Sequence, residues 1–237
     1  MKKILIVLFL MFVCSVCHAE AISFLTEDEI STGVKFLPLP PEPTDASFYN
    51  DWQRYQWGKS MRDTERGKQA IEDAAHTLEY LSTIYSEPFG MEISKENTPE
   101  IWALLDRSLV TACLCKDKAK NRLMRHRPFV QFNEPTPIPE DEEALRNNSS
   151  YPSGHTTMGW AIALVLAEIN PERQDEILKR GFEYGESRVI VGFHFQSDVD
   201  AARIITSVLI NRLNANEDFR LQLNKAKAEF QQKKVLQ

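Results

Sequence analysis

The sequence predicts an all-α protein, a single-domain bundle of helices preceded by a proline-rich arm. Apolar residues recur at helical spacing from residue 47 onward, and helix start and stop signals separate the segments. No alternating pattern of convincing length predicts a strand. With 237 residues, 43% of them hydrophobic and 26% charged, the chain is long enough to bury a sizeable core. Because no Gly/Ser tract divides it, we expect one domain over residues 47–237.

The amino end has the layout of a secretory signal. Lys2 and Lys3 precede an apolar run, residues 4–13, that is too short to span a bilayer permanently. Cleavage after Ala19 and cleavage after Ala21 both satisfy the small-residue rule. We therefore predict a signal peptide over residues 1–19, possible cleavage after Ala21 being the alternative, and export to the periplasm or the medium. No permanent membrane span is expected in the mature chain.

The segments that follow are predicted from breakers and periodicity. Residues 22–46 contain several closely spaced prolines and predict an extended arm that lies on the body. A loop rich in proline and acidic residues is expected over residues 132–143. The expected helices cover about residues 47–56, 62–85, 98–126, 156–169, 172–191 and 198–213, with a charged helix from residue 218.

Charge and cysteine content exclude several classes of partner. The formal net charge is −6 and becomes more negative if the signal is removed with its two lysines, so nucleic acid is not an expected partner. Cys113 and Cys115 lie two apart on a predicted helix and point to roughly opposite sides, so we expect packing residues rather than a mutual disulfide, with an intermolecular bridge as the minor alternative. No CxxC pair or His-x-His cluster indicates zinc, and we expect neither a metal site nor a cofactor.

The first stretch that suggests chemistry is residues 151–155, just before the apolar helix at 156–169. The first N–H groups of a helix have no intrahelical partner and carry the positive end of the peptide dipoles, so they favour an anion. Ser153 adds a hydroxyl and Gly154 a free backbone amide, while His155 adds a group that titrates near neutral pH. Taken alone, this stretch favours a capped helix with a surface histidine, because Pro-Ser-Gly often precedes a helix.

The second stretch is the cationic end of the helix predicted over residues 98–126. Lys120 and Arg127 are seven residues apart, which on a helix places both on one face about 10 Å apart along the axis. Such a face could hold two oxygens of one phosphate. The alternative is that these cations only complement the helix dipole.

The third stretch combines Arg188, His194 and Asp198. A carboxylate that binds one ring nitrogen of a histidine sets the tautomer and leaves the other nitrogen as a nucleophile. A buried histidine satisfied by a neighbouring aspartate, and a salt-bridged arginine, would give the same pattern without catalysis.

The three stretches together resemble one family signature. They spell Lys120-x6-Arg127-Pro128, Pro152-Ser153-Gly154-His155 and Ser187-Arg188-x5-His194-x3-Asp198. This pattern, over residues 120–198, is similar to that of the bacterial class A nonspecific acid phosphatases, within the superfamily of type 2 phosphatidic acid phosphatases and vanadium haloperoxidases. One position departs from the class A pattern, since Ser149 stands where that pattern has glycine.

The resemblance implies a secreted, metal-independent phosphatase acting on small phosphomonoesters, with an acidic optimum and a homodimer or larger homo-oligomer. The implied catalytic residues are His194 as nucleophile, Asp198 as its orienting partner and His155 as acid and then base. The implied phosphate ligands are Lys120, Arg127, Ser153, Gly154 and Arg188. The natural substrate stays open among nucleotides, sugar phosphates and inositol phosphates.

Three other functions compete with this interpretation. Phosphatases for lipid phosphates or diphosphates are usually integral membrane proteins, and vanadate-dependent haloperoxidases tend to be much larger. A phosphate-binding or purely structural helical protein would keep the cations without needing His155 or His194. The presence of both histidines favours the enzyme.

Overall fold

The computed structural model describes residues 22–120 and 123–236. Within these residues every regular element is a helix, which confirms the predicted all-α class. The predicted signal peptide, residues 1–19, lies outside the described residues. The division into an arm at 22–46 and a domain at 47–237 stays a prediction.

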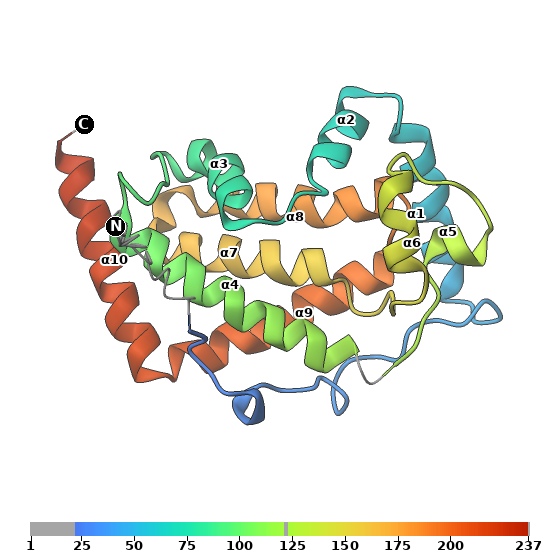
Figure 1. Ribbon diagram of the computed structural model, residues 1–237, viewed down its shortest axis with the longest axis horizontal. Coiled ribbons are helices and arrows are strands. Elements are labelled where there is room, and N and C mark those ends of the chain that lie inside the picture. The colour runs from blue at the N-terminus through green and yellow to red at the C-terminus, as the bar shows by residue number, and fades with distance from the viewer. Residues whose placement is uncertain (1–21, 121–122, 237) are drawn as a thin grey trace, which may run out of the picture.

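Four long helices form the body of the bundle: α4 (Pro99–Lys120), α7 (Gly154–Ile169), α8 (Gln174–Ile190) and α9 (Gln196–Asn214). Helix α7 lies in the middle and packs against the other three (Figure 1). Its only charged side chain is Glu168, and most of its residues are buried, so it can be surrounded on all sides.

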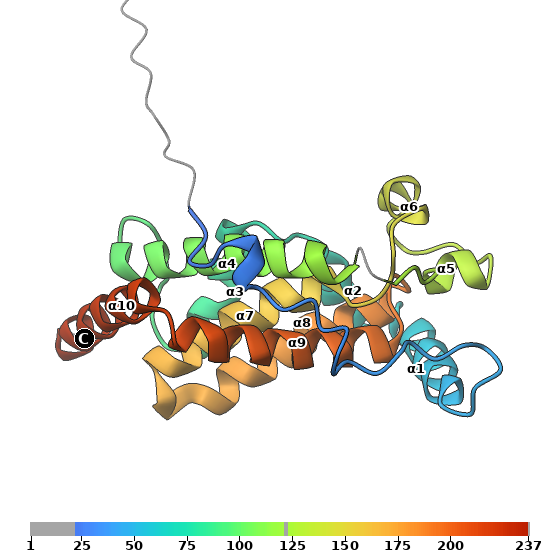
Figure 2. The same cartoon turned by 90° about the horizontal axis from the view of Figure 1, so that it is seen from below.

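Shorter and outer helices complete the fold: α1 (Phe48–Met61), α2 (Glu65–Glu72), α3 (Leu78–Phe89), α5 (Pro128–Gln131), α6 (Pro139–Arg146) and α10 (Glu217–Val235). Helix α10 packs on α4 and crosses one end of the bundle, whereas α1, α5 and α6 gather at the opposite end (Figures 1 and 2).

The direction of the four long helices decides where the functional stretches meet. Helices α4 and α8 run toward the end that carries α1, α5 and α6, and α7 and α9 start there (Figure 1). Two helix carboxyl ends and two helix amino ends therefore meet at one end of the bundle. The three functional stretches, which are far apart in the sequence, therefore lie next to one another in the structure.

The predicted helix over residues 98–126 is too long. Helix α4 ends at Lys120, and Arg127 has extended backbone angles, φ −76° and ψ 155°, as the residue before α5. A residue that precedes proline is driven away from helical angles, and Pro128 follows here. The backbone N–H of Ser150 donates to the Arg125 carbonyl at 2.9 Å, which also holds this segment out of a helix. The prediction that Lys120 and Arg127 share one helix face is therefore wrong.

Two other predicted boundaries also differ. The helix predicted over residues 62–85 is divided into α2 and α3 by residues 73–77, and Thr77 caps α3 by accepting from the Tyr80 N–H at 3.3 Å. Part of the loop predicted over residues 132–143 is helical, because Pro139 starts α6 and three acidic residues occupy its first turn. The predicted helices at 156–169, 172–191 and 198–213 are confirmed within a few residues.

Residues 22–46 contain one short 3-10 helix, η1 (Glu27–Glu29), and otherwise turns and irregular backbone. Phe24, Leu25 and Ile30 are buried in the main core. Near the other end of the segment, the Tyr151 hydroxyl donates to the Pro38 carbonyl. The segment is thus joined to the main core at one end and to the residues just before α7 at the other.

Cys113 and Cys115 on α4 are both free thiols. Across residues 22–120 and 123–236, no helix combines the length and the apolar character needed to cross a bilayer.

The contact between α7 and α8 offers a test of this packing. A Cβ atom at Gly159 would lie 2.3 Å from Cδ1 of the fully buried Tyr184. We expect Gly159→Ala to lower the free energy of unfolding by about 1–3 kcal/mol through overpacking, although alanine favours helix by about 1 kcal/mol. Thermal and urea denaturation would measure this. The control is Ser207→Ala at an exposed position of α9, and an equal effect of both variants would contradict the close packing.

Candidate active site

A cavity of about 200 Å³ opens where the four helix ends meet. Six of the eight predicted site residues line it: Lys120, Arg127, Gly154, His155, Arg188 and His194. The other two, Ser153 and Asp198, are fully buried behind this lining. The structure thus brings all three sequence stretches to one place.

His194 lies between the end of α8 and the start of α9 and is 2% exposed. Its Nδ1 is 3.5 Å from Oδ2 of Asp198 and 3.3 Å from the Ser150 hydroxyl, which itself donates to Asp198. Because Asp198 is an acceptor, this arrangement places the ring proton on Nδ1. Nε2 then keeps its lone pair on the cavity side. Ser150, which the sequence analysis did not single out, mediates between the two predicted residues.

Asp198 is held by several donors besides the histidine. The backbone N–H of Phe195, the N-cap residue of α9, donates to it at 2.8 Å, and Arg125 donates from the segment after α4. Arg125 is buried and also binds Asp51 at 2.7 Å. The carboxylate is therefore immobile, and it orients His194 from a fixed position.

Arg127 approaches the free ring nitrogen of His194 from the cavity side. Its Nη1 lies 3.0 Å from Nε2 and also donates to the Phe193 carbonyl at 3.0 Å. Its Nε donates to the Leu145 carbonyl at 3.1 Å. Backbone carbonyl groups thus fix the guanidinium group of Arg127. Arg127 reaches them from an extended backbone, not from a helix face shared with Lys120.

The cations around His194 keep its ring neutral. Burial lowers the pKa of His194 well below its ordinary value, and Arg127, Lys120 and Arg188 lower it further. A neutral imidazole is the nucleophilic form, and in the structure its Nε2 lone pair accepts a hydrogen bond from Arg127.

Arg188, at the end of α8, carries the strongest indication of what the cavity binds. Its side chain is 1% exposed, and its Nε and Nη1 have no hydrogen-bond partner in the described residues. Burial lowers its pKa to about 10, so it is still a cation at neutral pH. A buried cation with unpaired donors is costly unless an anion binds it.

Lys120 and Gly154 also line the cavity. A Cβ atom at Gly154 would lie 2.6 Å from Cδ of Lys116 and 3.4 Å from Cε of Lys120, so glycine lets both lysine side chains cross the amino end of α7. Lys120 donates to the Ser149 carbonyl. Burial, followed by repulsion from Arg127, lowers the pKa of Lys120 to about 7.

Ser153 is the N-cap of α7 and does not line the cavity. Its hydroxyl oxygen accepts from the Thr156 N–H at 3.4 Å and from the Thr156 hydroxyl at 2.9 Å. Its backbone N–H donates to the Asp198 carbonyl at 3.0 Å, which ties the start of α7 to the start of α9.

His155 lies in the first turn of α7 and donates from Nε2 to the Ala74 carbonyl at 2.9 Å. This contact leaves Nδ1 as the nitrogen that can exchange a proton with a ligand. Burial lowers the pKa of His155, and Arg188 lowers it further, while the Ala74 carbonyl acts in the opposite direction. The ring of His76 lies 4.7 Å from that of His155 and was not anticipated from the sequence.

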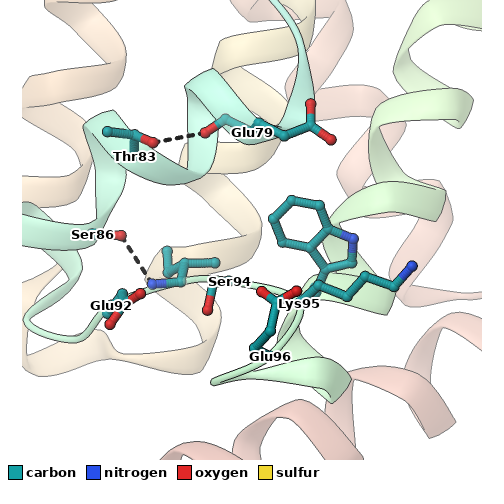
Figure 3. A pocket seen from close by; sticks show the side chains of 9 residues that line it. Glu79, Thr83, Ser86, Glu92, Ser94, Lys95 and Glu96 are labelled. Carbon is teal, nitrogen blue, oxygen red and sulfur yellow. Dashed lines mark hydrogen bonds between the residues drawn. The ribbon is translucent and has the colours of Figure 1, made fainter.

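A larger cavity, of about 520 Å³, lies between α3 and the beginning of α4, toward the other end of the bundle (Figure 3). Its titratable lining residues are Glu79, Glu92, Glu96 and Lys95. Three carboxylates and one lysine do not favour an anion, and no histidine lines this cavity. The cationic cavity is therefore the candidate active site.

Comparison with known proteins identifies a family for most of the chain. Residues 102–217 match the PAP2 superfamily. The chain is 47% identical over 208 residues to a non-specific acid phosphatase of Providencia stuartii, covering 87% of this chain and 84% of that protein. It is 41% identical over 239 residues to a non-specific acid phosphatase of Salmonella typhimurium, covering 100% and 96%. It is 36% identical over 197 residues to an acid phosphatase of Zymomonas mobilis, covering 82% and 75%.

The lowered pKa of Lys120 leads to a test of anion binding. Sulfate keeps its charge across neutral pH, whereas Lys120 loses its proton as the pH rises through about 7. We therefore expect the Kd for sulfate, measured by calorimetry, to be nearly constant at low pH and to rise by up to about tenfold per pH unit above that pKa. Lys120→Met should bind weakly and lose this dependence, while Lys118→Met, which removes a half-buried lysine of α4 that does not line the cavity, should retain it. A wild-type Kd that does not change with pH would contradict the assignment.

Proposed function

This chain belongs to the PAP2 superfamily and is an acid phosphatase, and we propose that its cationic cavity hydrolyses phosphate monoesters in two steps through a phosphohistidine at His194. The observation that carries the proposal is the pairing of two features in one cavity. Arg188 presents unpaired donors that need an anion, and His194 presents a neutral nitrogen toward the same space. A bound phosphoryl group accepts hydrogen bonds from Arg188 and is the electrophile that His194 attacks.

The cations and the amino end of α7 hold the phosphoryl oxygens. Arg188 donates through its unpaired nitrogens, Arg127 and Lys120 add two further cations, and the Gly154 amide adds the helix start. These groups stabilise the charge on the equatorial oxygens in the transition state. Ser153 lies behind the cavity lining and caps α7, with its oxygen accepting from Thr156, so its predicted contact with the phosphoryl group stays a prediction.

In the first step, Nε2 of His194 attacks phosphorus in line as the bond from phosphorus to the ester oxygen breaks. Arg127 exchanges its contact with Nε2 for one with a phosphoryl oxygen. His155 donates a proton from Nδ1 to the departing alcohol, while Asp198 and Ser150 keep the proton on Nδ1 of His194 and stabilise the ring as it becomes cationic.

In the second step, His155, now neutral, removes a proton from a water molecule that attacks phosphorus. The bond from phosphorus to Nε2 breaks, and inorganic phosphate is released with His194 neutral again. Both steps use the same cations, so no reorganisation of the phosphate site is needed between them.

The proton for the first step can arrive with the substrate. His155 has a lowered pKa in the free protein, whereas a phosphate monoester has a second pKa near 6 and is a monoanion at acidic pH. Transfer of the monoanion's proton to His155 yields the dianion and the imidazolium that the step requires. This explains why an acidic optimum fits a histidine that is neutral before substrate binds.

Export and self-association also stay proposals. The layout of residues 1–19 supports export, and no observation in residues 22–120 and 123–236 identifies a dimer contact. Small phosphomonoesters are the proposed substrates, and no further partner is needed for the reaction.

Loss of the nucleophile tests the proposed function. We expect His194→Ala to lower kcat/KM for phenyl phosphate by at least about 1,000-fold and to abolish the acid-labile phosphoenzyme trapped by rapid quenching. His126→Ala, which removes an exposed histidine after α4, should leave both measurements unchanged. A phosphoenzyme that persists in His194→Ala would assign the nucleophile to another residue.

The pH dependence of kcat/KM supplies a second test. Because the pKa of His194 is lowered, its nucleophilic form persists as the pH falls through 6.5, and we expect the acidic limb of kcat/KM to lie well below that value. The alkaline limb should follow the second ionisation of the substrate near pH 6. Lys120→Met removes one of the cations that lower the pKa of His194, so its acidic limb should move to higher pH. An acidic limb near 6.5 in the wild type would contradict this electrostatic account.

A further inference from the structure

The backbone acceptor for His155 comes from a segment that is distant in sequence. The Ala74 carbonyl, which accepts from Nε2 of His155, belongs to residues 73–77 between α2 and α3. Ala74 is 81 residues from His155 in the chain. The orientation of His155 therefore depends on what holds this short segment against the bundle.

Asp73, directly before Ala74, is the anchor of the segment. Its carboxylate is fully buried and accepts four hydrogen bonds from side chains. Arg180 of α8 contributes two donors in a bidentate pair, the Ser187 hydroxyl of α8 donates at 2.6 Å, and the Tyr80 hydroxyl of α3 donates at 2.9 Å. Asp73 thus connects α8 and α3 to the residue that contacts His155.

The segment has a second connection to α8. The Tyr184 hydroxyl donates to the Ala75 carbonyl at 2.9 Å. Since Tyr184, Ser187 and Arg188 all lie on α8, the helix that carries the unpaired phosphate donor also carries the donors that hold the Ala74 carbonyl. The position of His155 is thereby fixed relative to the position of the phosphoryl group.

A structural role alone does not explain this arrangement well. A buried ion pair usually contributes little net stability, because desolvation of both charges offsets their attraction. A carboxylate with four donors nevertheless holds the adjoining backbone in one place. Precise orientation matters for an acid that must reach an ester oxygen, since proton transfer needs hydrogen-bond geometry.

We propose that Asp73, paired with Arg180, is a positioning residue for the general acid His155. It holds the Ala74 carbonyl against Nε2, which keeps the proton-transferring Nδ1 aimed at the leaving group and favours the protonated ring. This inference rests on the proposed function, in which His155 protonates the departing alcohol. Asp73 itself contacts neither the phosphoryl group nor the ester.

The leaving group distinguishes a positioning role from a general loss of structure. An alkoxide such as ethoxide needs protonation as it departs, whereas dinitrophenolate does not. We expect Asp73→Asn to lower kcat/KM for ethyl phosphate by about 100-fold, within the range for loss of general acid catalysis, and kcat/KM for dinitrophenyl phosphate by less than about threefold. The Kd for sulfate should change less than about twofold, because the phosphate ligands are untouched.

A double mutant tests whether Asp73 acts through His155. If it does, adding Asp73→Asn to His155→Ala should lower kcat/KM for ethyl phosphate no further than His155→Ala alone. If Asp73→Asn does not fold, Tyr80→Phe removes one of the four donors and should show the same leaving-group selectivity, with a loss of about three- to tenfold for ethyl phosphate.

Two outcomes overturn different parts of the account. Equal losses for both esters in Asp73→Asn, or additive losses in the double mutant, overturn the positioning role. If His155→Ala itself shows no selectivity between the two esters, His155 is not the general acid, and the proposed mechanism fails together with the inference that depends on it.

Discussion

The structure depends on one electrostatic constraint, the crowding of three buried or partly buried cations around a neutral histidine. Burial lowers the pKa of His194, and Arg127, Lys120 and Arg188 lower it further. Burial and then repulsion from a neighbouring cation also lower the pKa of Lys120 and of Arg127. Such a group is unfavourable without an anion, yet the fold maintains it by fixing Arg127 with backbone carbonyls and Lys120 with the Ser149 carbonyl. The arrangement is therefore prepared for a phosphoryl group before one arrives.

The antiparallel order of the long helices makes this crowding possible. Helix carboxyl ends carry Lys120 and Arg188 to one end of the bundle, where the amino ends of α7 and α9 supply Gly154, His155 and Asp198 (Figure 1). The hydrogen bond from the Ser153 N–H to the Asp198 carbonyl joins the two amino ends directly. Each functional side chain thus stands on, or next to, the end of a rigid element, which suits a site that requires accurate geometry.

The fold class and most of the cavity residues could be predicted from the sequence. The contacts that position these residues could not, for physical reasons that differ from residue to residue. The all-α class and the identities of the cavity residues follow from periodicity, breakers and the three-part pattern. The prediction that Lys120 and Arg127 share a helix face was wrong. Pro128 drives the preceding Arg127 away from helical backbone angles, whatever the spacing of the residues before it. Ser150, Arg125 and Asp73 were missed because their roles arise from contacts between segments 44 to 114 residues apart. The Ala74 carbonyl could not have been found at all, since a backbone acceptor leaves no mark on residue identity.

The central claim is that His194 and water attack the same phosphorus in succession from one cavity. The stereochemical course at phosphorus tests it most directly. A phosphorothioate monoester made chiral by oxygen isotopes would be hydrolysed in water enriched in a third isotope, and the configuration of the released thiophosphate determined. Two in-line displacements predict net retention of configuration. Net inversion would mean that water attacks the substrate directly, and it would contradict the phosphohistidine account.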